Sequence, residues 1–371
     1  MKISGGPREP QALISSELVQ VTPAAAATLS EAQRAPGGAS SAHDVAIAEL
    51  QRLLGAWRAH EPGARLGEDP EELHQLRVTA RRIDATLALF KRQLPRALLR
   101  LRKTTKIVLR SLGAARDLDV QLEELARYCA RLPEREQAAA EPLRGFLERE
   151  RAQARERMLR SLDSEPVRHW LETLTRSSAV APRARGNDRA MAVVPERVER
   201  RYRKLRKSVD RLRAKASMED YHEVRRRAKQ LRYATECGAL MFGKPADELL
   251  KALRRLQDRL GAHQDAYMAQ TRLAALAADP VSALPAQTLF LMGRLAEHHA
   301  QITTQARQTL ASSWRKVRGR RWKALRTRLG ELRESATALP DVLAAIEAAN
   351  AAPAQIAAVR AAESDPRPLK H

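Results

Sequence analysis

The sequence predicts a basic, all-α protein that contains a duplicated unit. Apolar residues recur at intervals of three and four, the spacing that one face of a helix requires, and no strand-like alternation persists. The stretch 74–120 recurs at 222–268 without a gap. The chain of 371 residues carries a formal net charge of +23. Together these observations favour packed helices with basic faces and a polyanionic partner.

The duplication is indicated by cationic residues that recur at the same positions of both copies rather than by sequence identity between the copies. An offset of 148 places His74 on His222, and only nine of the 47 aligned pairs are identical, which alone is weak support. The string LGAARD at 112–117 meets LGAHQD at 260–265. Self-similarity at one offset is typical of a repeated structural unit. The pairs that are cationic or can become so in both copies are His74/His222, Arg77/Arg225, Arg81/Lys229, Arg96/Lys244, Lys103/Lys251 and Lys106/Arg254.

The chain divides into two helical modules, a linker and two tails. Ala, Pro, Gly and Ser dominate residues 1–40 without sustained periodicity, which predicts a disordered arm. Ser, Pro, Gly and Asn between 176 and 195 predict a linker, with Pro195 as the first residue of the next helix. We therefore predict a first bundle over 41–175, the linker over 176–195, a second bundle over 196–335 and an Ala-rich tail over 336–371.

The first copy begins with an amphipathic helix that carries a basic row. Apolar residues from Leu76 to Leu94 are spaced 4, 3, 4, 3 and 4, the stripe with which a helix meets other helices. His74, Arg77 and Arg81 are spaced 3 and 4, so they project together beside this stripe. The second copy repeats the row as His222, Arg225, Lys229 and Arg232.

A second helical pattern follows Pro95 in the first copy. Lys103 and Lys106 lie off its apolar stripe, and we expect Gly113 to end the helix. Asp117 lies where it could cap the next helix or pair with a nearby arginine. The corresponding residues of the second copy are Lys251, Arg254, Gly261 and Asp265.

Several of these strings resemble a known family. The run EPGARLGEDPEELHQLRVTARR from Glu61, then LGAARDLD, HEVRRRAKQLRY and LQDRLGAHQD, resembles the CHAD family, the conserved-histidine α-helical domain, over roughly 42–330. The resemblance implies two four-helix bundles related by a pseudo-twofold axis, with a basic channel between them that binds inorganic polyphosphate. Family members often follow a domain marked by ExExK. The nearest string here, ERERA at 148–152, lacks the lysine, which predicts a stand-alone form.

The basic rows supply the candidate polyphosphate-binding residues. We expect the leading histidines to donate hydrogen bonds to phosphate; orienting the helix start, or acting as a phosphorylated or general-acid group, are the alternatives. Arg110 and Arg116 are weaker candidates because the second copy has Asp258 and Gln264 there. The full set is His74, Arg77, Arg81, Arg82, Lys103, Lys106, Arg110, Arg116, His222, Arg225, Arg226, Lys229, Arg232, Lys251 and Arg254.

Two other functions fit the charge less well. A nonspecific nucleic-acid binder would need stacking rings among its cations, and of the aromatic residues only Phe90, on the apolar stripe, interrupts the basic rows from His74 to Lys106. A phosphate-chain enzyme would need clustered carboxylates for a metal or a glycine-rich phosphate loop, and the sequence has neither on these rows. We therefore predict a non-catalytic binding module without cofactor or metal.

The remaining sequence features are consistent with a cytoplasmic protein. Cys129 and Cys237 lack metal-ligand spacing, which predicts ordinary core thiols in a reducing compartment. No apolar run approaches the 18 or so residues of a membrane span, and the N-terminus has no signal-like apolar region. We expect a cytoplasmic location, with polyphosphate granules as the candidate site of action. The sequence does not indicate the oligomeric state.

Overall fold

The computed structural model describes residues 41–179, 189–212, 216–279 and 283–336. These residues are helical, and the only strand-type pairing among them is one isolated bridge between Ser41 and Arg189. The prediction of an all-α fold is therefore confirmed. The predicted arm over 1–40 and all of the predicted tail after residue 336 lie outside the described residues.

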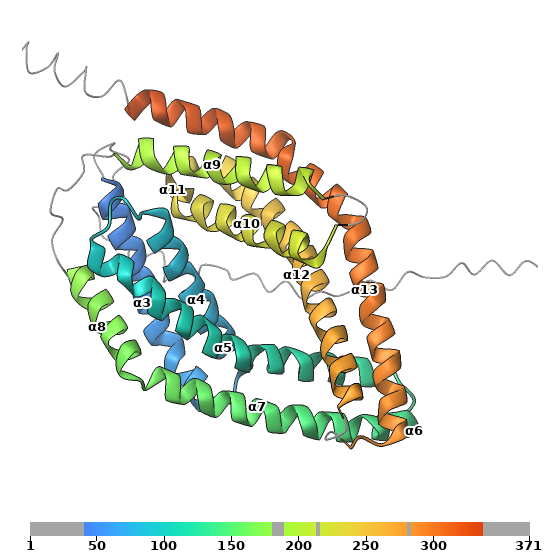
Figure 1. Cartoon of the computed structure of the whole chain (residues 1–371). Helices are drawn as coiled ribbons and strands as arrows, with labels where there is room; N and C mark the ends of the chain where they lie inside the picture. The colour runs from blue at the N-terminus through green and yellow to red at the C-terminus, as the bar shows by residue number, and fades with distance from the viewer. Residues whose placement is uncertain (1–40, 180–188, 213–215, 280–282, 337–371) are drawn as a thin grey trace, which may run out of the picture. The chain divides into compact units, whose positions relative to one another are not determined.

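The first group of helices packs around α4 and α5 (Figure 1). α3 packs on α4, α4 on α5 and α5 on α7, and α8 covers both α3 and α5. Trp57 of α3 and Trp170 of α8 are both fully buried, with their rings 5.0 Å apart in an edge-on arrangement. The elements are α3 (Ala42–Leu66), α4 (Pro70–Leu89), α5 (Arg96–Cys129), α6 (Glu134–Gln137), η1 (Ala138–Ala140), α7 (Glu141–Leu162) and α8 (Glu165–Ala179).

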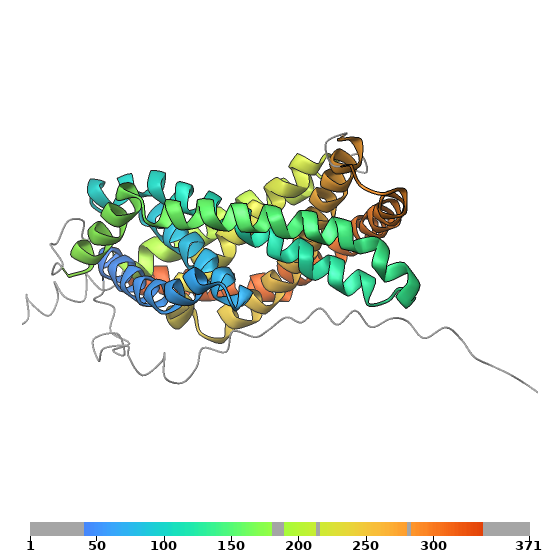
Figure 2. The ribbon, with the colours of Figure 1, turned by 90° about the horizontal axis from the view of Figure 1, so that it is seen from below.

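The second group repeats this order of packing. α9 packs on α10, α10 on α12 and α12 on α13, just as α3, α4, α5 and α7 follow one another in the first group. The groups meet where α4 packs on α10 and α3 on α9, and again where α13 packs on η1 and α7. Figure 2 shows the same helices from below. This arrangement is consistent with the predicted duplication; the pseudo-twofold axis stays a prediction. The elements are α9 (Ala190–Asp210), α10 (Met218–Cys237), α11 (Ala239–Phe242), α12 (Lys244–Ala278), α13 (Ala286–Arg318) and a helical run over 320–336.

Equivalent caps fix the starts of α4 and α10. The Asp69 side chain accepts from the backbone of Glu71, and Pro70 occupies the first helical turn. Ser217 and Asp220 form a reciprocal capping box at the start of α10. Residues 69 and 217 are related by the repeat offset of 148. The leading histidines therefore lie at the same distance from the start of each helix.

The two glycines expected to end helices lie inside them. α5 continues through Gly113 to Cys129, and α12 continues through Gly261 to Ala278. Both glycines have negative φ and lack the left-handed conformation of a helix C-cap. The expectation was wrong because the buried apolar stripe does not stop there. In α5 it continues through Ala115, Leu118 and Leu125.

Both ends of the predicted linker are helical, its middle at 180–188 lies outside the described residues, and Pro195 is not the first residue of α9. α8 extends to Ala179, and α9 begins at Ala190. Ala190, Val194 and Val198 are buried at spacings of four, so the apolar stripe of α9 starts five residues before the proline. Pro195 lies within the first two turns, where its missing N–H removes a single helical hydrogen bond.

Candidate functional site

The basic rows of α4 and α10 meet where these helices pack together. Arg77 of α4 lies near Arg225 of α10. Further along both helices, Arg82 Nη2 of α4 lies 3.5 Å from Glu236 Oε2 of α10. The helices therefore run in the same general direction, and the equivalent residues Arg77 and Arg225 lie near each other. We call Arg77, Arg81, Arg225 and Lys229 the central cluster; each repeat contributes two of its members.

The central cluster holds more positive than negative charge, and burial lowers the pKa values of three of its members. Burial, reinforced by Arg77, lowers the pKa of Arg81 to about 10. Burial, together with the charges of Arg225, Arg81 and Arg77 in that order, lowers the pKa of Lys229 to about 6. Burial, and then the charge of Arg225, also lower the pKa of Arg77. A bound anion would relieve both desolvation and repulsion among these cations.

Two equivalent aspartates partly balance the cluster. Asp117 Oδ1 of α5 lies 3.5 Å from Arg77 Nη2, and Asp265 Oδ1 of α12 lies 3.6 Å from Arg225 Nη2. Both pairs obey the offset of 148. Of the two roles considered for these aspartates, pairing with an arginine is confirmed. Because both carboxylates are about half exposed or more, at 65% and 49%, the pairs are weak enough for a phosphate to displace.

Gly113 lets Arg77 approach α5 closely. A Cβ at residue 113 would overlap Nη1 of Arg77. At the equivalent Gly261, a Cβ would lie 3.6 Å from Nη2 of Arg225, an ordinary contact. The glycine of the first repeat thus has a spatial role at the site in place of the expected role at a helix end.

The leading histidines face α5 and α12. His74 is half-buried, and burial lowers its pKa; Glu71 opposes this change, whereas Arg116, Arg81 and Arg77 add to it. His222 is exposed, with its Nδ1 3.3 Å from Gln264 Oε1. Positions 116 and 264 are equivalent, so each histidine faces the same position of the neighbouring helix.

Three further candidates extend the basic surface along α5. Lys103, Lys106 and Arg110 are all exposed. Together with Gly113 and Asp117 they are spaced 3, 4, 3 and 4, which places them on the face that meets Arg77. In the second repeat Lys251 and Arg254 are exposed at the equivalent positions, although Lys251 Nζ also lies 3.1 Å from Glu248 Oε1.

The other candidates contact acidic residues of the same chain. Arg82 Nη2 and Arg232 Nε both lie about 3.5 Å from the Glu236 carboxylate, at 3.5 and 3.4 Å. Arg226 pairs with Glu223 one turn away on α10. Arg116 Nη1 lies 2.9 Å from Glu123 Oε1 on α5. The positive charges of these four residues are therefore compensated by nearby carboxylates more fully than those of the central cluster.

The sequence analysis missed Glu124 and Arg272, which occupy equivalent positions of the two repeats. The pKa of Glu124 is raised to about 7, mainly by burial; the charge of Arg127 opposes this rise and the charge of Asp265 adds to it. Burial lowers the pKa of Arg272, and the charges of Glu150 and Asp117 partly offset that effect. These contacts place the C-terminal half of α5 near that of α12. The offset of 148 relates the two residues, but because they carry opposite charges they are absent from the cations that the two repeats share.

Comparison with known proteins assigns the family. The family model described as the CHAD domain matches residues 48–274, more than half of the chain. This chain belongs to the CHAD domain family. The expected resemblance is thereby confirmed. No curated protein matches the chain.

Two solved structures share the CHAD-domain fold. The structure titled PptA from Streptomyces chartreusis has 21% sequence identity and a TM-score of 0.59, covering 74% of this chain and 100% of its own. The crystal structure of the CHAD domain from the plant Ricinus communis has 22% identity and a TM-score of 0.55, covering 80% of this chain and 94% of its own. At these identities the likeness concerns the fold alone.

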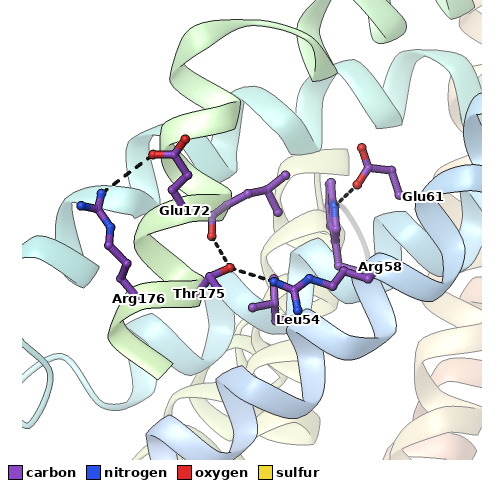
Figure 3. A pocket seen from close by; sticks show the side chains of 8 residues that line it. Leu54, Arg58, Glu61, Glu172, Thr175 and Arg176 are labelled. Carbon is purple, nitrogen blue, oxygen red and sulfur yellow. Dashed lines mark hydrogen bonds and ion pairs between the residues drawn. The ribbon is translucent and has the colours of Figure 1, made fainter. Parts of the chain in front are cut away.

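A pocket between α3 and α8 of the CHAD-domain protein has a different character from the central cluster (Figure 3). Arg58 donates to the Thr175 hydroxyl at 3.0 Å, and Arg176 lies 3.9 Å from Glu172. Trp57 donates to Glu61 at 2.8 Å. Because its two carboxylates accompany two arginines, this pocket offers a polyanion no excess of positive charge.

Among the described residues, no group of three or more His, Cys, Asp and Glu side chains is arranged to hold a metal ion. None of the helices described here is both long and apolar enough to cross a membrane.

Proposed function

We propose that this CHAD-domain protein binds inorganic polyphosphate at the central cluster and along the basic face of α5. The observation that carries the proposal is the convergence of Arg77, Arg81, Arg225 and Lys229 from two repeats. Burial and mutual repulsion lower the pKa values of Arg77, Arg81 and Lys229. Such a cluster is costly without an anion. The family resemblance, which implies polyphosphate binding, supports the same ligand.

The chemistry of the ligand fits the arrangement of the side chains. Polyphosphate has no bases or stereocentres, so a protein can recognise only its charge density and spacing. Arginine forks bind phosphate oxygens in pairs, and lysines act as point charges. Lys103 lies ten residues before Gly113, or about 15 Å along the helix axis. The row on α5 is thus long enough to follow several phosphates away from the central cluster.

The aromatic side chains near the site favour a phosphate chain over a single-stranded nucleic acid. Tyr233 is 8% exposed, with the Arg232 guanidinium 5.0 Å from its ring centre, and Phe90 is fully buried. Neither ring can serve as a stacking platform for bases. We still expect nonspecific binding to nucleic acid at low salt, because the net charge is +23.

Calorimetric titration of the full chain tests the proposal. The ligands are long-chain polyphosphate, tripolyphosphate and single-stranded DNA of matched charge, at about 150 and 500 mM salt. The test variant is Arg77→Gln/Arg225→Gln. The control is Arg160→Gln/Arg168→Gln, which removes the same charge from two arginines that are 68% and 63% exposed on α7 and α8.

The proposal expects polyphosphate to bind more tightly than DNA and to remain bound at the higher salt. It also expects the Arg77/Arg225 variant to lose at least tenfold in affinity while the control changes little. Equal affinity for DNA, or equal losses in both variants, would reduce the site to a generic basic surface.

The same arrangement supports a role in binding rather than catalysis. The central cluster supplies cations, and the two carboxylates that form ion pairs with it, Asp117 and Asp265, lie on different helices beside separate arginines. We propose a module that attaches to polyphosphate in the cytoplasm, at granules or on a chain handled by another protein. Incubation of any purified sample with polyphosphate should leave the chain length unchanged on a gel.

A further inference from the structure

A second group of cations lies where α9 meets the end of α13 and the run 320–336. The segment 315–328 contains eight Lys and Arg residues and no acid. Arg206 of α9, Arg318 of α13 and Arg326 of the final run are all exposed. All three are close enough to Tyr202 to lower the pKa of its hydroxyl, although burial raises that pKa overall. We call these three arginines the outer basic face.

Stacked aromatic rings hold the outer basic face in place. The Tyr202 ring lies 3.6 Å from the Trp322 ring, with 6° between their planes, and 6.0 Å from the ring of Trp314. α13 ends at Arg318, with Gly319 as its C-cap, and the run 320–336 then lies alongside α9 (Figure 1). Arg333 anchors this run through two contacts of 3.0 Å to Glu199. The three arginines therefore project from a rigid base formed by buried side chains.

The positive charge of this face is largely unbalanced. Asp210 is the acid beside it, with Oδ2 3.5 Å from Arg206 Nε. Within the described part of the chain, no carboxylate oxygen lies within 4.0 Å of the Arg318 or Arg326 guanidinium. More exposed cations flank the face on the same helices: Arg203, Lys207, Arg315 and Lys323.

The outer basic face shares no helix with the central cluster. Its members come from α9, α13 and the run 320–336, whereas the central cluster comes from α4 and α10. The run 320–336 also contacts the start of α12, where Arg321 Nε lies 3.8 Å from Glu248 Oε2. A ligand on the outer basic face would therefore bind to different elements of the second repeat.

We propose that the outer basic face is a second binding site for inorganic polyphosphate. This inference rests on the proposed function and extends it to a second place on the same molecule. Exposed arginine forks suit phosphate oxygens. The nearby rings of Tyr202, Trp314 and Trp322 are buried against one another, so none is available to stack on a base. Charge complementarity without stacking favours a phosphate chain.

The test compares two triple variants of the full chain. Arg206→Gln/Arg318→Gln/Arg326→Gln removes the outer basic face. Arg160→Gln/Arg168→Gln/Arg176→Gln removes three arginines of α7 and α8 that are 68%, 63% and 70% exposed. Both variants lose the same net charge. Each is titrated with long-chain polyphosphate, tripolyphosphate and single-stranded DNA over a range of salt concentrations.

We expect the outer variant to bind less long-chain polyphosphate per molecule. The slope of log affinity against log salt should also fall by about 2, the value for three lost phosphate contacts at about 0.7 each. The control should keep the stoichiometry and slope of the unmodified protein. If the triple variant fails to fold, Arg326→Gln alone should give roughly a third of the change in slope.

Two results overturn the inference: an outer variant that titrates like its control, or one that loses affinity for DNA but not for polyphosphate. A parallel titration of Arg77→Gln/Arg225→Gln separates the two proposals. If that variant binds like the unmodified protein while the outer variant binds weakly, the central site fails and the outer site stands. If only the central variant weakens, the outer site fails and the proposed function stands.

Discussion

Arg77 of α4 reaches so close to Gly113 of α5 that a Cβ at residue 113 would overlap its guanidinium. The same guanidinium lies 3.5 Å from Asp117, one turn further along α5. In the second repeat Arg225 stands 3.6 Å from the position of a Cβ on Gly261. Both repeats therefore have a glycine at this position, but only in the first repeat does the arginine occupy the space that a Cβ would need.

This difference predicts opposite results for two identical substitutions. Gly113→Ala should displace Arg77 and weaken polyphosphate binding severalfold. Gly261→Ala should leave binding unchanged and stabilise α12 by about 0.5 to 1 kcal/mol, since alanine is the better residue inside a helix. Titration calorimetry and thermal unfolding of both variants provide the measurement. Equal affinities for the two variants would contradict a spatial role for Gly113.

The misinterpreted glycines show what a sequence pattern can and cannot predict. Helical periodicity predicted the helices, and the offset of 148 predicted which residues of the two copies correspond. A glycine after an apolar stripe, however, is compatible with a helix end or with close approach of another chain segment. At Gly113 the deciding contact is with Arg77, 36 residues earlier in the chain, and periodicity carries no signal for that distance.

The aspartates beside the cluster should compete with the ligand. Asp117→Asn removes a carboxylate that is 65% exposed and holds Arg77, so we expect polyphosphate affinity to rise about two- to fivefold. The free energy of unfolding should change by less than about 1 kcal/mol, because exposed ion pairs contribute little. Calorimetric titration and urea denaturation measure the two effects.

Asp163→Asn is the matched control for this prediction. Asp163 is also 65% exposed and also pairs with an arginine, Arg65, but both residues lie in the first bundle at α3 and the end of α7. It raises the net charge by the same amount. An equal gain in affinity from Asp163→Asn would mean that only net charge matters.

Composition could not separate ligand-binding cations from structural ones. Arg197 belongs to a segment of α9 dense in basic residues, yet its side chain is only 5% exposed. It donates to the Leu89 carbonyl at the end of α4, and its Nη2 lies 2.6 Å from Gln93 Oε1. A basic segment on one helix gives no indication that one of its arginines satisfies the last carbonyls of another helix.

Arg197→Leu should therefore destabilise the fold. Loss of buried hydrogen bonds from a charged donor costs about 1.5 to 3 kcal/mol, and we expect that decrease in the free energy of unfolding. Urea denaturation measures it, with Arg52→Leu as the control, because Arg52 is 48% exposed and pairs with Glu49 of its own helix. An unchanged unfolding midpoint for Arg197→Leu would show that this contact does not stabilise the fold.

The depressed pKa of Lys229 predicts that binding takes up a proton. At pH 7.5 a lysine with a pKa of about 6 is mostly neutral, and a bound polyanion raises that pKa and favours the charged form. Each binding event should then take up about one proton, to which His74 adds because its pKa is also lowered. The observed enthalpy should vary with the ionisation enthalpy of the buffer.

The sign of the pH dependence follows from the same values. Below about pH 6 Lys229 is already protonated in the unliganded protein, so the affinity does not depend on its titration. Above that pH the proton must be taken up, and affinity should fall by up to about tenfold per pH unit until the pKa of the complex is reached. Lys229→Arg should abolish most of the uptake, since arginine stays charged, and should raise affinity at pH 8. The control is Lys251→Arg, the same change at a lysine that is 61% exposed, which should alter neither the proton uptake nor the affinity at pH 8. If Lys251→Arg abolished the proton uptake, Lys229 would not be the group that titrates.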